Sequence, residues 1–271
     1  MSVNDYCFTR DIVDNNRINL QHYLWIELFG YHIHPAIPTS NPTLRIADIG
    51  TGTGIWLTDL ARRLPDSVSL DGLDISFDAA PPPKWLPSNI TLKSFDIKAD
   101  VPDHLRGIYD IVHIRNFSFI IRDPEIEQVT RNLLQVLKPG GYIQWAEPDV
   151  DSFRINKGEP DSKIDALRNL AAACQDRDSL FRGTWVAKLS TVLEDIGLEE
   201  VQADVKDGAF HTNVAIHECN LVIPLLIARK MKDKTVEERV KQLMPEAEKE
   251  TGDGSHFAFT RYTVIGRKGA E

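Results

Sequence analysis

Three closely spaced glycines follow an apolar stretch early in the chain and could hold a ligand against the backbone. The segment DIGTGTGIW places Gly50, Gly52 and Gly54 directly after LRIADIG. Glycine makes sharp turns without steric cost and lets a ligand approach the main chain closely. The dinucleotide fingerprint would need a glycine where Ile55 stands, and no lysine completes a phosphate-binding P-loop. The turn therefore predicts a ligand site without a dedicated phosphate partner; the alternative is a plain strand–helix turn.

Two carboxylates end the next apolar stretches and suit the sugar and base of a nucleoside. Asp74 ends SVSLDGLDI, 20 residues beyond Gly54, where it can accept hydrogen bonds from both ribose hydroxyls. A carboxylate there would repel a 2′-phosphate, which disfavours NADP. Asp96 ends the segment ITLKSFD and can accept from an exocyclic adenine amine, while Ile97 packs on the ring. Each Asp could instead be an ordinary turn or cap residue.

The elements that must position these residues alternate between apolar strands and amphipathic helices. Strands are predicted over 44–50, 67–75, 90–97, 109–114, 141–149, 197–205 and 256–268. Helices are predicted over 17–30, 55–64, 123–137, 164–174, 186–196 and, in a long insertion, about 213–250. Such alternation implies right-handed crossovers and a mostly parallel sheet that binds ligands at the carboxyl ends of its strands.

The pattern predicts one α/β structural domain assembled from three parts. Residues 1–43 form an N-terminal helical cap segment, 44–150 the ligand-binding core, and 151–271 complete the sheet and carry a helical lid at about 213–250. Asp123 is expected to cap a helix whose first position is Pro124. Pro224 is expected to kink or break the helical insertion.

The composition indicates a globular protein and argues against several other classes. The chain has 31 Lys+Arg against 40 Asp+Glu, a net charge of −9, which argues against non-specific nucleic-acid binding. The 42% hydrophobic content is typical of a globular domain. The polar N-terminus lacks a signal-peptide pattern, and the three cysteines, Cys7, Cys174 and Cys219, form no zinc-binding pair. We expect a soluble cytoplasmic protein with no metal and no membrane contact.

The motifs together resemble a known family. IADIGTGTGIW, LDGLDIS, SFDI, YDIVHIRN and LKPGGYIQWAEPD, in this order and spacing, are similar to those of class I S-adenosylmethionine-dependent methyltransferases. More narrowly, INLQHYLWIELFGYHIHPAI, HIRNFSF and KPGGYIQWAEPD resemble the fungal natural-product branch. The resemblance covers roughly residues 17–150 and implies a Rossmann-like fold with a mostly parallel, seven-stranded sheet and a helical cap.

The resemblance also implies a cofactor, S-adenosyl-L-methionine, and the residues that hold it. Each residue sits at or near the carboxyl end of a predicted strand. The methionine part would lie among Asp48, Gly50, Thr51, Gly52 and Gly54, the ribose against Asp74 and Ile75, the adenine against Asp96 and Ile97, and the sulfonium above Arg115 and Asn116. A sulfonium cation without phosphates suits a phosphate-free glycine turn ringed by carboxylates.

Fewer residues are candidates for a direct role in methyl transfer. A base is needed only if the methyl acceptor is protonated at working pH, and His22 and Glu147 are the candidates. Tyr23, Phe117 and Trp145 are candidates to line an apolar acceptor pocket, although aromatic residues at such spacing are more often core. The partner would be a small molecule, and we allow for a homodimer.

The expected function is methyl transfer to O, N or C of a small natural product. Two alternatives from other classes remain open. A protein of this fold could bind the cofactor yet catalyse a pericyclic or cyclisation step, or it could be a regulatory, partner-binding member. Product mass, raised by one methyl group or unchanged, separates the first alternative; co-purification of a stable partner without turnover would favour the second.

Overall fold

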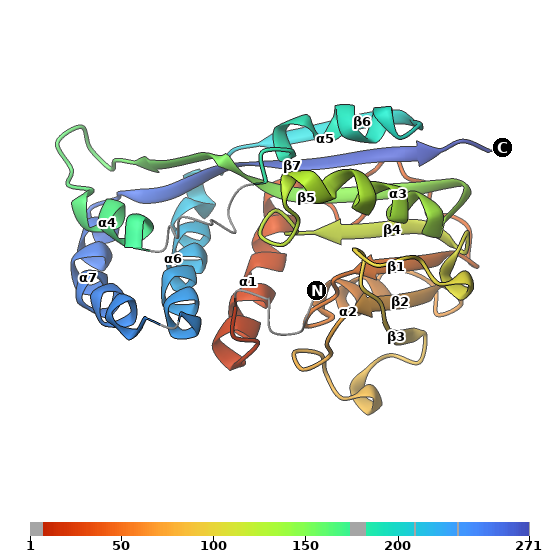
Figure 1. Cartoon of the computed structure of the whole chain (residues 1–271), viewed down its shortest axis with the longest axis horizontal. Helices are drawn as coiled ribbons and strands as arrows, with labels where there is room; N and C mark the ends of the chain where they lie inside the picture. The colour runs from red at the N-terminus through yellow and green to blue at the C-terminus, as the bar shows by residue number, and fades with distance from the viewer. Residues whose placement is uncertain (1–7, 174–182, 209, 232, 271) are drawn as a thin grey trace.

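The computed structural model describes residues 8–173, 183–208, 210–231 and 233–270, which form one seven-stranded sheet with helices on both faces (Figure 1). The sheet order is β3-β2-β1-β4-β5-β7-β6. The strands are β1 (Arg45–Ile49), β2 (Ser69–Asp74), β3 (Ile90–Ser94), β4 (Tyr109–Arg115), β5 (Leu137–Asn156), β6 (Leu198–Lys206) and β7 (His256–Lys268). All seven predicted strands are present, although β5 is much longer than expected.

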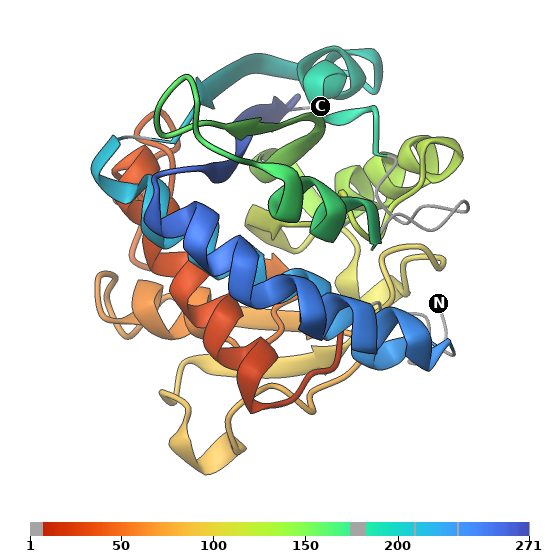
Figure 2. The ribbon, with the colours of Figure 1, turned by 90° about the vertical axis from the view of Figure 1, so that its left-hand side faces the viewer.

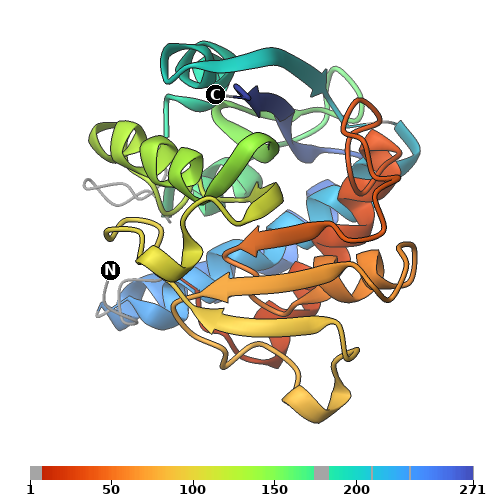
Figure 3. The same cartoon turned by 90° about the vertical axis from the view of Figure 1, so that its right-hand side faces the viewer.

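The sheet is doubly wound, because the strand order runs outward in both directions from β1. Strand β1 pairs in parallel with β2 and with β4, and β2 and β4 pair in parallel with β3 and β5. Figure 3 shows β1, β2 and β3 pointing the same way. Only β7 runs antiparallel to its neighbours β5 and β6. The α/β, mostly parallel fold predicted from the sequence is confirmed. The strand order reverses between the neighbours β1 and β4, and such sheets bind ligands at the carboxyl ends of the strands at this switch point.

The helices pack in two groups. They are α1 (Ile12–Phe29), α2 (Ile55–Ala61), α3 (Ile126–Val136), α4 (Asp165–Ala173), α5 (Leu189–Asp195), α6 (Asn213–Lys230) and α7 (Lys234–Gly252). Helices α2, α3 and α5 cover the faces of the sheet, whereas α1, α6, α7 and α4 pack together at one end of it (Figures 1 and 2). This second group comprises α1 of the cap segment, α6 and α7 of the helical insertion, and α4, which precedes the insertion in the chain.

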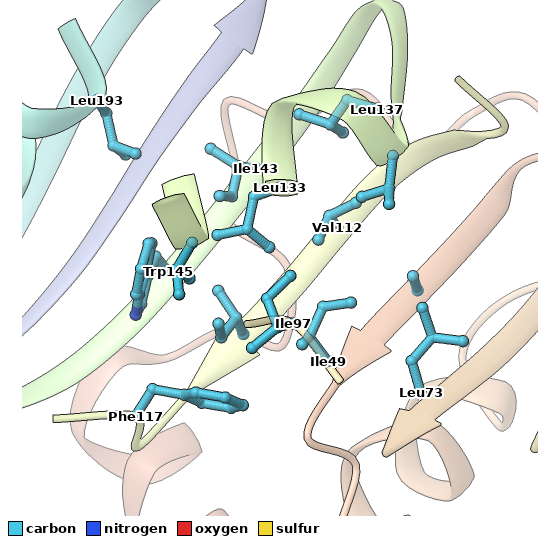
Figure 4. Packing of buried hydrophobic residues seen from close by; sticks show 14 of the residues in the cluster. Ile49, Leu73, Ile97, Val112, Phe117, Leu133, Leu137, Ile143, Trp145 and Leu193 are labelled. Carbon is cyan, nitrogen blue, oxygen red and sulfur yellow. The ribbon is translucent and has the colours of Figure 1, made fainter. Parts of the chain in front are cut away.

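Helices cover both faces of the sheet. Successive residues of a strand point to opposite faces, so each of them is buried against one layer of helices. On β4, Val112 packs in the cluster under α3 and α5, while Ile111 packs in the cluster under α2. Figure 4 shows the first cluster, in which Trp145 of β5 lies near Ile143 and Leu133. The sheet is therefore a rigid platform for the loops at its carboxyl edge.

Helix α1 begins and ends at clear sequence signals. The Asp11 side chain accepts hydrogen bonds from the amides of Val13 and Asp14, and Gly30 ends the helix in the left-handed conformation at φ 86°. The helix predicted from residue 17 therefore starts about one turn earlier. The C-terminal end at Gly30 was predicted correctly.

Three local predictions were wrong. Asp123 does not cap a helix: its carboxylate accepts from the amide and hydroxyl of Thr184, while Glu125 bonds back to the amide of Arg122. Helix α6 continues through Pro224, so the break expected there was wrong, while the kink stays a prediction; α6 ends at Lys230 and the next helix, α7, begins at Lys234. The helix predicted to reach residue 64 ends at Ala61.

Candidate functional site

A cleft opens at the carboxyl ends of the central strands, between the sheet and α1. Ten of the eleven residues predicted to hold a cofactor line it: Asp48, Gly50, Thr51, Gly52, Asp74, Ile75, Asp96, Ile97, Arg115 and Asn116. Gly54 does not, because it serves as the N-cap of α2. We call this space the main cleft. Residues from four strand ends converge there, as a doubly wound sheet requires.

The glycine turn exposes its backbone to the main cleft. Gly52 has φ 55°, and a Cβ added there would meet nothing closer than the Gly50 oxygen at 3.9 Å. A side chain at this position would therefore extend into open space rather than into the core. At Gly50, by contrast, an added Cβ would lie 2.5 Å from the Phe117 ring. The first glycine admits Phe117 and the second keeps the cleft open.

Asp74 joins the glycine turn to the second strand. Its Oδ2 accepts from the amide of Gly52 at 2.9 Å, and its Oδ1 accepts from the amide of Ser76 at 3.2 Å. Burial raises the pKa of Asp74, and these amides oppose the rise. Each carboxylate oxygen can still accept a further hydrogen bond. Asp74 therefore fixes the turn and can also accept from a ligand.

Asp48 faces the main cleft from β1 and is held by a buried histidine. His113 Nδ1 lies 2.7 Å from Asp48 Oδ1, and the imidazole stacks on Trp56 with 4.0 Å between ring centroids. Burial lowers the pKa of His113, which favours its neutral form. The Asp48 charge is thus oriented without being cancelled. Both His113 and Trp56 line the cleft, and neither was predicted to do so.

Two cleft residues have buried polar atoms that lack a hydrogen-bond partner. Thr51 Oγ1 and Asn116 Oδ1 have none among the described residues. Asn116 also adopts φ 64°, which costs energy in a residue other than glycine. Its Nδ2 donates to Gln21 Oε1 at 3.3 Å, which ties the strand end to α1. A strained residue with an unused buried acceptor is a good candidate to contact a ligand.

Helix α1 supplies a wall of the main cleft, as expected of the cap segment, through residues that the sequence did not single out. Arg17, Ile18 and Gln21 line it. Arg17 is paired with the buried Asp14 at 2.6 Å, so its charge is balanced inside the cap. The three positions share one helix face, with spacings of one, three and four residues. Because two of the three are polar, the face carries no amphipathic signal toward the sheet.

His22 lies behind the cleft rather than in it. It is fully buried, and its Nδ1 lies 3.2 Å from Arg115 Nη2, while its Nε2 lies 3.0 Å from Asp59 Oδ2. Arg115 itself lines the main cleft and lies 5.8 Å from the centroid of the Trp25 ring. His22 can therefore act on a ligand only through Arg115.

His22, His32 and Asp59 place one potential metal-ligating atom each within 4.8 Å of one another. His32 Nε2 also lies 2.6 Å from Asp59 Oδ2. An arginine nitrogen can only donate, so Arg115 assigns the lone pair of His22 to Nδ1 and its proton to Nε2. That proton occupies the position that a metal would need. The geometry favours a hydrogen-bonded network, and the absence of a metal stays a prediction.

This network predicts an acid-sensitive contribution to stability. Burial and the Arg115 charge lower the pKa of His22 from 6.5 to about 4. Between these values the unfolded chain binds the proton more strongly, so acidification should destabilise the fold by about 2–3 kcal/mol through this residue. Urea unfolding of wild type and His22→Asn at pH values across this window measures it. The amide of the variant can still accept from Arg115.

The His22→Asn protein should lose this part of the pH dependence. His104→Asn is the matched control, because His104 is exposed and its replacement should leave the wild-type slope unchanged. Equal slopes in wild type and His22→Asn would contradict the assignment of His22 as a buried neutral acceptor.

Glu147 does not reach the main cleft. It is fully buried, and its carboxylate accepts from the amides of Phe117 at 2.6 Å and Ser118 at 2.9 Å and from Trp145 Nε1 at 2.7 Å. Burial raises the pKa of Glu147 to about 7, against these three donors. Its contacts hold the loop that carries Asn116 and Phe117.

Of the three residues predicted to line an acceptor pocket, one lines the main cleft and two do not. Phe117 lines the main cleft. Trp145 is fully buried in the core under α3 and α5, because alternation on β5 turns it to that face. Tyr23 is 51% exposed on α1 and lines no described cavity. Trp145 therefore faces the core rather than the cleft, and contact of Tyr23 and Phe117 with a substrate stays a prediction.

The cysteines give no indication of a metal site within the described residues. Cys219 is buried and free, and Cys7 and Cys174 lie outside the described residues. Within the described part of the chain, no helix is both long and apolar enough to cross a membrane.

Comparisons with known proteins agree with this geometry. The profile of the Methyltransferase domain family matches residues 46–141, which span β1 to the start of β5. The chain is 36% identical over 144 residues to Methyltransferase grgD of Penicillium sp, covering 51% of this chain and 50% of that protein. It is 33% identical over 165 residues to N-methyltransferase tcpN of Claviceps purpurea, covering 59% and 57%. The chain spans about half the length of these relatives.

A solved structure shows the same fold. Phosphoethanolamine N-methyltransferase 2 of Haemonchus contortus, in complex with S-adenosyl-L-methionine, matches with a TM-score of 0.51 at 12% identity, covering 93% of this chain and 52% of that one. Residues 46–141 thus match a methyltransferase domain, the chain has the Rossmann-like fold of that solved structure, and it is similar to fungal methyltransferases.

Proposed function

We propose that this protein, whose core is a class I methyltransferase domain, transfers a methyl group from S-adenosyl-L-methionine to O, N or C of a small natural product. The observation that carries the proposal is the main cleft, where an open glycine turn meets Asp48, Asp74 and Asp96 at the carboxyl ends of strands. The fungal relatives, one of which is an N-methyltransferase, support the reaction and the substrate class.

The cleft residues fit this cofactor. The open space at Gly52 would admit its methionine part near Asp48, and Asp74 would accept from the ribose hydroxyls. Asp96 and Ile97 would hold the adenine. The unused acceptors Thr51 Oγ1 and Asn116 Oδ1 provide partners for polar groups of the ligand. When bound, S-adenosylmethionine supplies an electrophilic methyl group on a sulfonium.

The protein's part in the reaction would be positioning. Holding nucleophile and methyl group in line is worth roughly 7–11 kcal/mol of barrier, without any catalytic base. We propose that His22 and Glu147 serve as positioning residues, because each touches the cleft only through a neighbour: His22 through Arg115, and Glu147 through the loop at Asn116 and Phe117. An acceptor that needs deprotonation would require a further group.

The proposal is tested by calorimetry and product mass. S-adenosylmethionine and S-adenosylhomocysteine should bind, and NAD should not. Incubation with extracts of candidate small molecules and methyl-labelled S-adenosylmethionine should yield a product heavier by one labelled methyl group. Turnover with unchanged product mass would favour a non-methylating reaction. Failure of both cofactor forms to bind would overturn the proposal. We also propose a cytoplasmic location and, on the acidic composition, no nucleic-acid partners.

We further propose that α1 and the helical insertion act as a lid. Helix α1 supplies three cleft residues, and α6 packs directly against α1. If ligands favour a closed arrangement, they should slow amide hydrogen exchange in residues 16–30 and 213–250. Exchange measured with and without saturating S-adenosylhomocysteine checks this, with α3 as the internal control. Equal exchange in both states would make these helices plain scaffold.

A further inference from the structure

Within the described part of the chain, the main cleft is lined by cationic side chains as well as by carboxylates. The cations are Arg10, Arg17, Lys98 and Arg115. Arg17 is paired with Asp14 at 2.6 Å, and Lys98 is paired with Glu125 at 2.7 Å. The charge of Arg10 lowers the pKa of Asp74, which places this arginine on the side of the cleft where Asp74 lies. Each of these three cations therefore acts on a carboxylate of the protein.

Arg115 differs from the other three, because no carboxylate is in contact with it. Among the described residues, no carboxylate oxygen lies within 4.0 Å of its guanidinium nitrogens. Its hydrogen-bond partner is an imidazole, His22 Nδ1, at 3.2 Å from Nη2. A guanidinium has five N–H donors, so this bond uses only one of them. Arg115 is half-buried and lines the open space of the main cleft, where the remaining donors can meet a ligand.

The Arg115 side chain keeps its charge in this position. Burial lowers its pKa to about 10, although the more distant charges of Asp48 and Glu147 oppose the fall. The neutral form of His22 cannot balance the charge. A cation held away from water without a counter-ion is costly, and an anion from a ligand would remove that cost.

Arg115 lies beside the glycine turn. Strand β1 pairs with β4 so that Ile49 is opposite Ile114, which brings the next residues, Gly50 and Arg115, side by side at the carboxyl ends of the strands. The acceptors Asp48 and Asn116 Oδ1 face the same cleft. The cleft volume is about 150 Å³, roughly ten times the 10–15 Å³ that one water needs. A group that carries both an ammonium and a carboxylate would find a partner for each charge here.

We propose, on the basis of the methyl-transfer function above, that Arg115 binds the carboxylate of the methionine part of the cofactor. The planar guanidinium presents a fork of donors that matches a carboxylate, and such charge-assisted bonds are stronger than neutral ones. The ammonium would then lie toward Asp48 and Asn116. Like charges repel, so Arg115 suits the carboxylate better than the sulfonium that we expected above it. His22 would hold the guanidinium in place through Nδ1.

A pair of ligands that differ only in the carboxylate tests this role. S-adenosylhomocysteine and its decarboxylated analogue, S-adenosyl-3-thiopropylamine, are titrated separately into the protein by calorimetry, with no methyl acceptor present. Wild type should bind S-adenosylhomocysteine about 10- to 100-fold more tightly than the analogue, the range for a lost charge-assisted bond. Because no acceptor is present, a carboxylate of the acceptor cannot produce this ratio.

The Arg115→Gln variant removes the charge, while its amide can still donate a hydrogen bond. S-adenosylhomocysteine should lose about 10- to 100-fold in affinity, and the two ligands should then bind within about threefold of each other. Arg131→Gln is the matched control, because Arg131 is exposed on α3, pairs with Glu127 and lies outside the main cleft. This control should keep the wild-type ratio. Arg115→Lys keeps the charge without the fork and should give an intermediate ratio.

The ratio of the two affinities separates the possible failures. Equal binding of both ligands by wild type would overturn the carboxylate site even if neither Arg115 variant folds. A wild-type ratio in a folded Arg115→Gln protein would show that another residue holds the carboxylate and would also overturn the proposal. In both cases S-adenosylhomocysteine still binds, so the methyl-transfer function stands. If wild type binds neither ligand, the proposed function fails and the carboxylate site fails with it.

Discussion

The Gly52→Val protein should lose S-adenosylhomocysteine binding by at least about 100-fold while remaining folded. Two effects combine. The position requires φ 55°, where an L-residue pays roughly 1–2 kcal/mol per residue and a β-branched one more. The valine side chain also enters the open space of the main cleft, which the ligand needs. Calorimetry with S-adenosylhomocysteine measures the loss, and far-UV circular dichroism checks the fold.

The Gly107→Val variant separates the effect of backbone strain from the effect of a side chain that fills the main cleft. Gly107 has φ 62°, and a Cβ there would meet nothing within 4 Å, but it lies at the opposite end of β4, away from the cleft. The Gly107→Val variant should therefore lose a similar amount of folding stability and bind S-adenosylhomocysteine as the wild type does. If Gly52→Val binds as well as Gly107→Val, the glycine turn does not contact the ligand.

Asp74→Ala should reduce affinity for S-adenosylmethionine by about 30- to 1000-fold. The carboxylate would provide up to two charge-assisted hydrogen bonds to the ribose, and their loss costs roughly 2–4 kcal/mol after water compensates in part. The variant also frees the amide of Gly52, which Asp74 now holds at 2.9 Å. Isothermal calorimetry provides the measurement.

Asp74→Asn distinguishes the two roles of this residue, because an amide oxygen can still accept from Gly52 but carries no charge. Its affinity should lie between those of wild type and Asp74→Ala. Asp78→Ala is the control: Asp78 is exposed, and its carboxylate accepts from the Ser76 hydroxyl at 2.8 Å. Wild-type affinity in a folded Asp74→Ala protein would remove Asp74 from the ribose site.

Local signals were enough to predict the strands and the cofactor half of the site. The glycine turn and the strand-end carboxylates depend on a few adjacent residues and on the rule that parallel strands bind ligands at their carboxyl ends. The structure brings Gly52, Asp74 and Asp96 into one cleft by that rule. Their contact with a cofactor remains a prediction.

The residues that face a methyl acceptor were harder to predict, because adjacent residues do not determine which way each side chain points in the folded protein. On β5, Trp145 and Glu147 share one face because side chains alternate, and that face happens to lie under α3 and α5. On α1, Tyr23 is exposed whereas Gln21 lines the main cleft. Which face of a polar helix meets the sheet is decided by tertiary packing, so the spacing of aromatic residues could not identify Gln21 as a cleft residue.

The insertion of β7 between β5 and β6 has a consequence for synthesis. While residues 256–268 are still inside the ribosome, β5 and β6 lack the strand that joins them, and both expose unpaired backbone edges. The glycine turn and its parallel strands can assemble earlier, because residues 45–115 pair among themselves. The strand ends that line the main cleft could thus come together before the sheet is complete, and a chain shortened after α7 would keep an open, aggregation-prone sheet edge.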